Sequence, residues 1–236
     1  MSEARTGKRA RPIVAIDGPA GAGKSTVAQR VADALGFVLV DTGAMYRVVA
    51  LSARNAGIPW DQGARVGQLA AELVKRQALG FERKPGGGIR VNLDGEDVSL
   101  TIRTPDIGMG ASQVSAHPEV RAALLELQRQ AGREGGVVLE GRDIGTVVFP
   151  DADVKFFLTA RPEIRARRRF EELSAKGQTV TFDQTLAETL RRDEQDSGRA
   201  HAPLRQADDA IAVDSSDSPV DEVVNQMVAR VRALST

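Results

Sequence analysis

A glycine-rich stretch, Gly18-Pro19-Ala20-Gly21-Ala22-Gly23-Lys24-Ser25, constrains the fold of this chain more than any other segment. It matches the pattern G-x-x-x-x-G-K-[ST], in which successive backbone N–H groups cradle a phosphate. The apolar, β-prone run Ile13–Ile16 precedes it, and Thr26–Leu35 has a helical pattern. The motif needs this context, a loop between a buried strand and a helix N-terminus. The sequence therefore predicts a phosphate-binding loop near the start of an α/β domain.

Each part of this loop has an expected role in holding the phosphates of a nucleotide. Its glycines let the backbone approach closely, because no Cβ stands in the way. Lys24 would bridge the β- and γ-phosphates, and Ser25 would hold Mg²⁺. The alternative is a glycine-rich turn that happens to precede a lysine, and the flanking strand and helix argue against it. The loop alone leaves a hydrolase, a transferase and a signalling switch all open.

Composition narrows the classes of protein that remain. The 32 Lys and Arg residues balance 32 Asp and Glu residues, which argues against a general nucleic-acid binder. Without cysteines, the chain has no disulfides, cysteine nucleophiles or thiolate metal sites, and two histidines are too few for a histidine-rich metal site. Residues 1–11 are polar and basic with no apolar run after them, so we expect a flexible tail rather than a signal peptide. Apolar runs elsewhere are far shorter than a membrane span, and we expect a cytoplasmic protein.

Five short apolar runs are expected to form a parallel sheet: Ile13–Ile16, Phe37–Val40, Val137–Leu139, Val154–Leu158 and Ala210–Val213. Helical stretches lie between them, so the fold class is α/β, with a parallel sheet flanked by helices. Ligands of such sheets bind beyond the carboxyl ends of the strands. Asp41, Glu140 and the phosphate loop all follow strands at that edge.

The second and third of these strands are separated by about a hundred residues, too many for a simple crossover. Helical patterns are expected at 44–57, 64–78, 104–115 and 118–132. Between them, Leu79–Arg83 and Ile89–Leu93 have the pattern of a hairpin. Asp94-Gly95 gives a further turn before a strand expected at 97–100. We therefore expect an inserted lobe that contains a small antiparallel sheet.

Arginines are concentrated near the C-terminal third of the chain. Residues 161–169 contain five arginines, and Arg191, Arg192, Arg199 and Arg205 form a second group. Gly177 marks a turn between two expected helices. During phosphoryl transfer, guanidinium groups neutralise the transferring phosphate, and a closing lid excludes water. A solvated helix face or a nucleic-acid patch is the alternative; the phosphate loop favours a lid formed by these arginine-rich helices. The guanine-binding pattern Asn-Lys-x-Asp does not occur, which argues against a GTPase.

Polar residues follow two of the expected strands. Thr42 is expected to cap a helix, and Arg47, one turn later, is suited to a second phosphate; ordinary capping with a surface arginine is equally consistent with these residues. Arg142 can clamp a phosphate through two hydrogen bonds. Asp143 can accept a hydrogen bond from an exocyclic amine such as cytosine N4. Glu140 can orient a water bound to Mg²⁺.

Together these segments resemble the bacterial cytidylate kinase family of P-loop nucleoside monophosphate kinases. The segments are the phosphate loop, D-T-G-A-M-Y-R at 41–47, A-S-Q-V at 111–114, E-G-R-D-I-G-T-V-V-F-P at 140–150 and R-D-E-Q-D-S-G-R at 192–199. They occur in the order of the family and cover most of the chain, and the inserted lobe, about 42–118, is typical of the bacterial members. The resemblance implies one kinase domain over 1–236, which transfers the γ-phosphoryl group of ATP to CMP or dCMP with Mg²⁺ as cofactor and releases CDP or dCDP and ADP.

The resemblance also implies roles for individual residues. ATP would be bound by Gly18, Pro19, Ala20, Gly21, Ala22, Gly23, Lys24, Ser25 and Thr26. CMP would be bound by Thr42, by Ser112, Arg121 and Asp143 at the cytosine ring, by Arg47, Arg142 and Arg199 at the phosphate, and by Arg192 and Asp196 near the ribose. The resemblance implies a lid at about 160–185. The implied catalytic residues are Lys24, Arg142, Arg165 and Arg168, with Arg161 and Arg167 as further lid candidates. Ser25 would hold Mg²⁺, with Glu140 acting through a water. Thr42 and Glu140 depart from the family pattern, in which Ser and Asp are familiar.

Other functions remain open at this point. A P-loop kinase could use another acceptor, such as UMP or shikimate, although a shikimate kinase needs neither Asp143 as a base reader nor the hairpin at about 80–100. An ATP-binding regulator or an RNA-binding protein without turnover would place its arginines on a nucleic-acid backbone. We expect ATP and CMP or dCMP as partners, without nucleic acid or membrane, and a monomer, because no unexplained apolar stripe remains.

Overall fold

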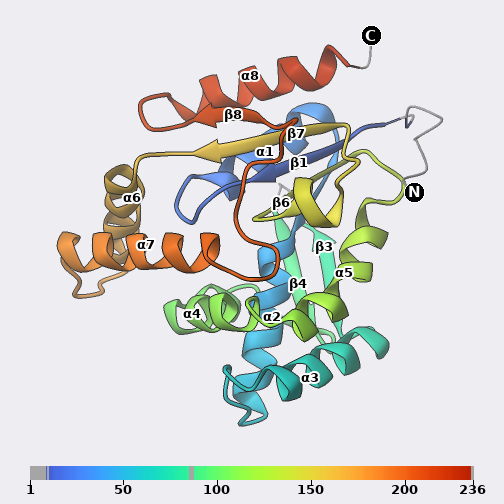
Figure 1. Ribbon diagram of the computed structural model, residues 1–236, viewed down its shortest axis with the longest axis vertical. Coiled ribbons are helices and arrows are strands. Elements are labelled where there is room, and N and C mark those ends of the chain that lie inside the picture. The colour runs from blue at the N-terminus through green and yellow to red at the C-terminus, as the bar shows by residue number, and fades with distance from the viewer. Residues whose placement is uncertain (1–8, 10, 85–87, 235–236) are drawn as a thin grey trace. The chain divides into compact units, whose positions relative to one another are not determined.

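The computed structural model describes residues 9, 11–84 and 88–234 (Figure 1). The chain divides into two compact units, Met1–Leu39 with Glu134–Thr236 (unit 1) and Val40–Arg133 (unit 2). Most of the tail expected at 1–11 lies outside the described residues. Arg9, which is described, donates hydrogen bonds to the carboxylates of Asp151 and Asp153. The single kinase domain, the lobe at about 42–118 and the lid at about 160–185 stay predictions.

Unit 1 contains the phosphate loop and most of the larger sheet. Its elements are β1 (Ile13–Asp17), α1 (Lys24–Leu35), β6 (Val137–Gly141), η2 (Ile144–Val148), β7 (Val154–Thr159), α6 (Pro162–Ala175), α7 (Phe182–Ser197), β8 (Ile211–Asp214) and α8 (Val220–Arg232). The strand order is β2-β6-β1-β7-β8, and β2 (Val38–Asp41) crosses the border between the units. β1 pairs in parallel with β6 and β7, and β7 pairs in parallel with β8. The expected α/β class and parallel sheet are confirmed.

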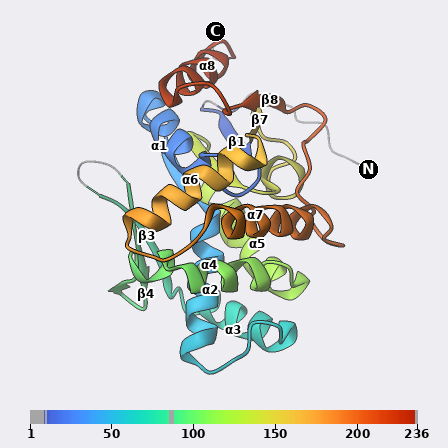
Figure 2. The same ribbon diagram turned by 90° about the vertical axis from the view of Figure 1, so that its left-hand side faces the viewer.

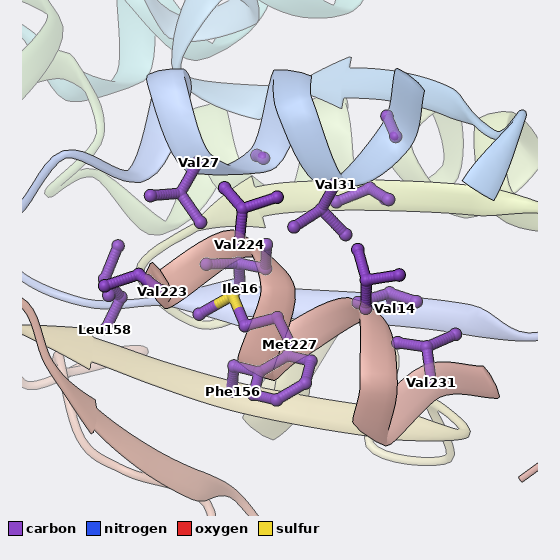
Figure 3. Packing of buried hydrophobic residues seen from close by; sticks show 14 of the residues in the cluster. Val14, Ile16, Val27, Val31, Phe156, Leu158, Val223, Val224, Met227 and Val231 are labelled. Atoms are coloured by element: carbon purple, nitrogen blue, oxygen red, sulfur yellow. The ribbon is translucent and has the colours of Figure 1, made fainter. Parts of the chain in front are cut away.

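The core of unit 1 lies between this sheet and the helices α1 and α8 (Figure 3). Ile16 of β1 and Phe156 of β7 point toward Val27 of α1 and Met227 of α8, and all four side chains are buried. The other face of β1 is buried as well, and it contacts the π-helical turn η2. Burial on both faces explains why β1 has a continuous apolar run instead of an alternating pattern. The same burial surrounds Asp17, the last residue of that strand.

The two arginine-rich helices of unit 1, α6 and α7, pack against each other (Figure 2). The turn between them contains Gly177 at a φ of 75°, in the left-handed region that glycine adopts easily. Thr181 and Gln184 form a reciprocal capping box at the start of α7. The expected helical pair is therefore present, and its function as a lid stays a prediction.

Unit 2 combines four α-helices with a small sheet among its described residues. Its elements are α2 (Thr42–Asn55), α3 (Gly63–Lys75), β3 (Leu79–Arg83), β4 (Ile89–Leu93), β5 (Glu96–Asp97), η1 (Thr101–Arg103), α4 (Pro105–Val114) and α5 (Pro118–Gly132). The strands form an antiparallel sheet in the order β3-β4-β5. The hairpin has its expected bounds, while part of its turn, 85–87, lies outside the described residues. The prediction of a strand at 97–100 is wrong, because β5 ends at Asp97.

The start of α2 differs from expectation. Thr42 is the first residue of the helix, and the cap is Asp41, whose carboxylate accepts a hydrogen bond from the Ala44 amide at 3.0 Å. A carboxylate at this position also favours the positive end of the helix dipole. None of the helices in the described part of the chain has the length and apolar character needed to cross a bilayer.

Candidate active site

The phosphate loop approaches its neighbours closely at two glycines. Gly18 has a φ of 151°, and a Cβ there would lie 1.9 Å from the carbonyl oxygen of Leu158 in β7. Gly23 has a φ of 90° and directly precedes α1. The first N–H groups of an α-helix have no partner within the helix and point at any anion bound there. The loop therefore has the backbone geometry of a phosphate site.

Lys24 is buried at the end of this loop, and its Nζ donates a hydrogen bond to the carbonyl oxygen of Pro19 at 2.7 Å. Burial lowers the pKa of Lys24 well below its usual range, and the charge of Arg142 lowers it further, against the opposing effect of Glu140 and Asp196. Anionic phosphates beside the ammonium would favour its charged form. Lys24 thus has the environment of a phosphate-binding lysine.

Ser25 and Glu140 provide adjacent oxygen atoms beside the loop. The hydroxyl of Ser25 donates a hydrogen bond to Oε2 of Glu140 at 3.0 Å. Glu140 is buried within β6, where it pairs with Ile16, so it lies inside the strand and not after it. Mg²⁺ commonly takes one or two protein oxygens together with waters and substrate phosphates. This hydroxyl and carboxylate fit such a site.

Asp196 joins two of the arginines that were predicted to hold the acceptor phosphate. Its carboxylate accepts from Nε of Arg142 at 2.9 Å and from Nη2 of Arg199. Burial alone would raise the pKa of Asp196, but Arg142 and Arg199 outweigh it, and together with Arg192 they hold the pKa below its usual range. The residue that follows β6, Arg142, and one that follows α7, Arg199, thus meet at one carboxylate of α7, and Asp143 is buried directly after Arg142.

The lid arginines are engaged within unit 1. Arg165 is 3% exposed and donates to the carbonyl oxygens of Ala160, at 2.8 Å, and Ala20, at 3.2 Å. It also forms a two-pronged ion pair with Asp193. These contacts attach α6 and α7 to the phosphate loop. Arg165 is therefore held in place by protein groups, and its catalytic role stays a prediction.

The remaining lid arginines lie in different surroundings. Arg168 donates to the backbone oxygen of Ser215 at 2.6 Å, and one of its nitrogens would lie 3.9 Å from a Cβ on Gly23. Arg168 thus lies beside the phosphate loop, as its predicted role requires. Arg161 pairs with exposed Asp217, and Arg167 lies over the ring of Phe182.

Unit 2 gathers four further predicted CMP-binding residues on α2, α4 and the start of α5. Arg121 lies over the ring of Tyr46 and donates to the carbonyl oxygen of Ser115. Ser115 in turn donates its hydroxyl to the carbonyl oxygen of Ser112 at 3.0 Å. These contacts link Ser112 and Arg121, two of the three residues predicted to read the base.

The other two residues of this set lie on α2. Arg47 donates to the carbonyl oxygen of Ile102 at 2.9 Å and lies beside Gly108 of α4. Thr42 is buried at the start of the helix. Of the elements that contain the predicted residues of unit 2, α2 packs against α4, and Arg121 of α5 contacts Tyr46 of α2.

Sequence reasoning missed several residues that organise the site. Asp193 pairs with Arg165, and the ring of Tyr46 lies under the guanidinium group of Arg121. Ser215 accepts a hydrogen bond from Arg168, although no motif in the sequence around Ser215 indicates this contact. Asp17 was also missed, although a charged residue directly before the phosphate loop, at the end of an apolar strand, was a usable signal. The other three are recognised only from contacts between distant parts of the chain.

Comparison with known proteins identifies the family of this chain. The family model described as Cytidylate kinase matches residues 14–233. A cytidylate kinase from Geobacter sulfurreducens is 57% identical over 93% of this chain and 92% of its own length. Those from Syntrophotalea carbinolica and Geobacter sp. strain M21 are 54% and 53% identical, over 92% and 93% of this chain and 90% and 92% of their own lengths. The chain belongs to the cytidylate kinase family.

Proposed function

We propose that this protein transfers the γ-phosphoryl group of ATP to CMP or dCMP and releases CDP or dCDP and ADP. The observation that carries the proposal is the cluster of Arg142, Asp196 and Arg199 in the unit that also contains the phosphate loop. A hydrolase needs no site for a phosphate-bearing acceptor, because water accepts the phosphoryl group. Guanidinium groups held by a buried carboxylate supply what a second, phosphate-bearing substrate requires.

The reaction needs no covalent intermediate on the protein. An oxygen of the acceptor phosphate attacks the γ-phosphorus, the bond from that phosphorus to the β–γ bridging oxygen breaks, and ADP leaves with the electron pair. Lys24 and the loop N–H groups hold the donor phosphates, while Arg142 and Arg199 hold the acceptor. Bound Mg²⁺, near Ser25 and Glu140, would neutralise charge on the β- and γ-phosphates.

Recognition of the base rests on Ser112, Arg121 and Asp143 in this proposal. Cytosine has a donor at N4 where uracil has an acceptor, so a carboxylate such as Asp143 favours CMP over UMP. Arg192 and Asp196 are proposed to lie near the ribose. Arg165 and Arg168 are proposed to stabilise the transferring phosphoryl group, and contacts of both with the phosphate loop support this proposal.

A coupled assay of ADP release tests the proposal, with CMP, dCMP, UMP and AMP as acceptors and Mg²⁺ present or chelated. We expect Mg²⁺-dependent release with CMP and dCMP and much less with UMP and AMP. The variant D143A should turn over UMP and CMP at more similar rates. A preference for another acceptor would contradict the proposed substrate, and release that ignores every acceptor would contradict the kinase function.

The expected partners and location follow from the same proposal. ATP and CMP or dCMP are the proposed partners, without nucleic acid or membrane, and the protein is proposed to act as a monomer in the cytoplasm, where its substrates occur. An RNA-binding function would show instead as salt-dependent retention of RNA by the purified protein in the absence of nucleotides.

A further inference from the structure

Asp17 has a place in unit 1 that the proposed chemistry does not use. It is the last residue of β1 and directly precedes Gly18 of the phosphate loop. Its carboxylate is buried, with the residue 4% exposed. Oδ1 accepts a hydrogen bond from the amide of Ile144 and Oδ2 accepts one from the amide of Gly145, both at 2.8 Å. One side chain therefore binds the two amides that follow Asp143.

The segment that Asp17 binds has an unusual backbone. Asp143 has a φ of −146° and a ψ of 26°, and the π-helical turn η2 begins at the next residue. The carbonyl oxygen of Asp143 accepts hydrogen bonds from the amides of Val147 and Val148. The first amides of a helical turn have no carbonyl within the turn to pair with. Asp17 supplies both acceptors, and so it fixes the backbone at the point where η2 starts.

Space around this contact is limited. A Cβ on Gly145 would lie 3.0 Å from Cδ of Lys155 and 3.4 Å from Oδ2 of Asp17. Lys155 is itself held by the carbonyl oxygen of Pro150, at 2.6 Å, and by the carboxylate of Asp209, at 2.8 Å. The turn therefore lies between a fixed lysine stem and the Asp17 carboxylate, and a small shift of either would move the backbone of Arg142 and Asp143.

We propose that Asp17 is a positioning residue for acceptor recognition, which holds the backbone of Arg142 and Asp143 in register with the start of the phosphate loop. This inference rests on the proposed function. Donor binding depends on the loop N–H groups and Lys24, whereas acceptor binding depends on the segment that Asp17 fixes. Loss of the carboxylate should consequently affect the acceptor more than ATP.

The test is the variant D17N, compared with D153N as a matched control. Asp153 accepts a hydrogen bond from the amide of Ile13, at the opposite end of the same strand and 2.9 Å away. In D17N one acceptor oxygen is replaced by an NH₂ group, which cannot accept from an amide. We expect kcat/KM for CMP to fall about 10- to 100-fold, the size expected for one lost charged hydrogen bond. The ratio of CMP to UMP turnover should fall in D17N, the KM for ATP should change little, and D153N should keep the wild-type ratio.

A second variant and a second measurement cover the case in which D17N folds poorly. G145A keeps the carboxylate but adds a methyl group 3.0 Å from Cδ of Lys155, which crowds the turn, and we expect it to lower the CMP-to-UMP ratio in the same way. Amide hydrogen exchange should be faster at Ile144 and Gly145 in D17N and unchanged at these amides in D153N.

Two outcomes separate this inference from the proposed function. A wild-type protein that phosphorylates no nucleoside monophosphate would overturn both. The other outcome is that the wild-type protein phosphorylates CMP and a folded D17N or G145A variant keeps the wild-type CMP-to-UMP ratio, the KM for CMP and slow exchange at both amides. This outcome would overturn the role of Asp17 alone.

Discussion

Two buried carboxylates of unit 1, Asp196 on α7 and Asp17 at the end of β1, have pKa values that are shifted in opposite directions. Both are almost fully buried, at 1% and 4% exposure. Asp196 faces the guanidinium groups of Arg142 and Arg199, which hold its pKa below the usual range although burial alone would raise it. Burial raises the pKa of Asp17 to about 6, and its two backbone amides offset only part of that rise.

The difference shows what each partner can do for a buried charge. A full positive charge outweighs the loss of water, whereas neutral amide dipoles do so incompletely. The neighbouring charge of Asp143 raises the pKa of Asp17 further, and Lys24 lowers it. Asp17 is thus harder to ionise in the folded protein, while Asp196 forms part of an ion-pair cluster. The contributions of the two residues to stability should therefore depend on pH with opposite signs.

The largest effect is expected for D196N. This change leaves Arg142 and Arg199 without the carboxylate that orients them, so we expect roughly 3 kcal/mol lower free energy of unfolding. Misplaced guanidinium groups should lower kcat/KM for CMP roughly 100-fold. Denaturant titration and steady-state kinetics measure these effects. The control E194Q changes an exposed carboxylate on the same helix and should behave as wild type; a D196N protein as stable and active as E194Q would contradict the assigned role.

The next effect is a dependence of stability on pH with a defined sign. Because the pKa of Asp17 is about 6 in the folded protein and 3.8 without the protein environment, the folded state binds this proton more tightly. Its contribution favours folding below pH 4 and is lost as the pH rises through 6. Unfolding of wild type and D17N should be compared at pH 4.5 and 7.5. We expect the stability of wild type relative to D17N to fall by about 2 kcal/mol over this interval.

Asp196 sharpens this test, because its lowered pKa predicts the reverse behaviour. Its contribution to stability is present above the pKa of the unfolded chain, near 4, and is lost as the pH falls through the lower pKa of the folded state. The difference between wild type and D196N should therefore stay constant from pH 5 to 7.5. A difference that changes in that interval would show that the ion pairs do not control the titration of Asp196.

Features of the fold that depend on local sequence patterns were predicted well. The strands of unit 1 and the hairpin of unit 2 were predicted because their patterns are local: apolar runs of strand length and turn residues between them. Pro118 marks the start of α5 for the same reason. The phosphate loop was predicted because its glycines have one dominant use.

The contacts that organise the site depend on pairs far apart in the chain. Asp17 and Ile144 are separated by 127 positions, and no local pattern connects them. Arg165 could be predicted as part of an arginine-rich helix, but its burial against Ala20 and Asp193 follows from how α6 packs. The cap of α2 was assigned to Thr42 and not to Asp41 because both residue types are good caps and the strand ends one residue later than expected.

A smaller effect is expected on the preference of the wild-type protein for CMP over UMP as the pH falls. Protonation of Asp17 turns one of its two carboxylate oxygens into a hydroxyl, which is a weaker acceptor, so the hydrogen bond to one amide of η2 weakens. We expect the CMP-to-UMP ratio of kcat/KM to decline between pH 7.5 and 5.5, a range that includes the pKa of about 6. CMP and UMP carry the same phosphate group, so the effect of its ionisation on kcat/KM cancels in the ratio. In D17N the ratio should be low and independent of pH in this range; a decline of equal size in D17N would assign the effect to another group.

The smallest effect is expected at an ion pair with similar chemistry but no burial. Arg161 donates two hydrogen bonds to the carboxylate of Asp217, at 2.8 and 2.7 Å, and the side chains are 54% and 75% exposed. Water and salt screen such a pair, and ordering two mobile side chains offsets much of its attraction. We expect D217N to unfold at the same denaturant concentration as wild type, at low and at high salt, under the conditions in which D196N is clearly destabilised. A loss of stability in D217N that approaches that of D196N would mean that the geometry of the arginine–carboxylate pair, and not its burial, determines how much the pair contributes.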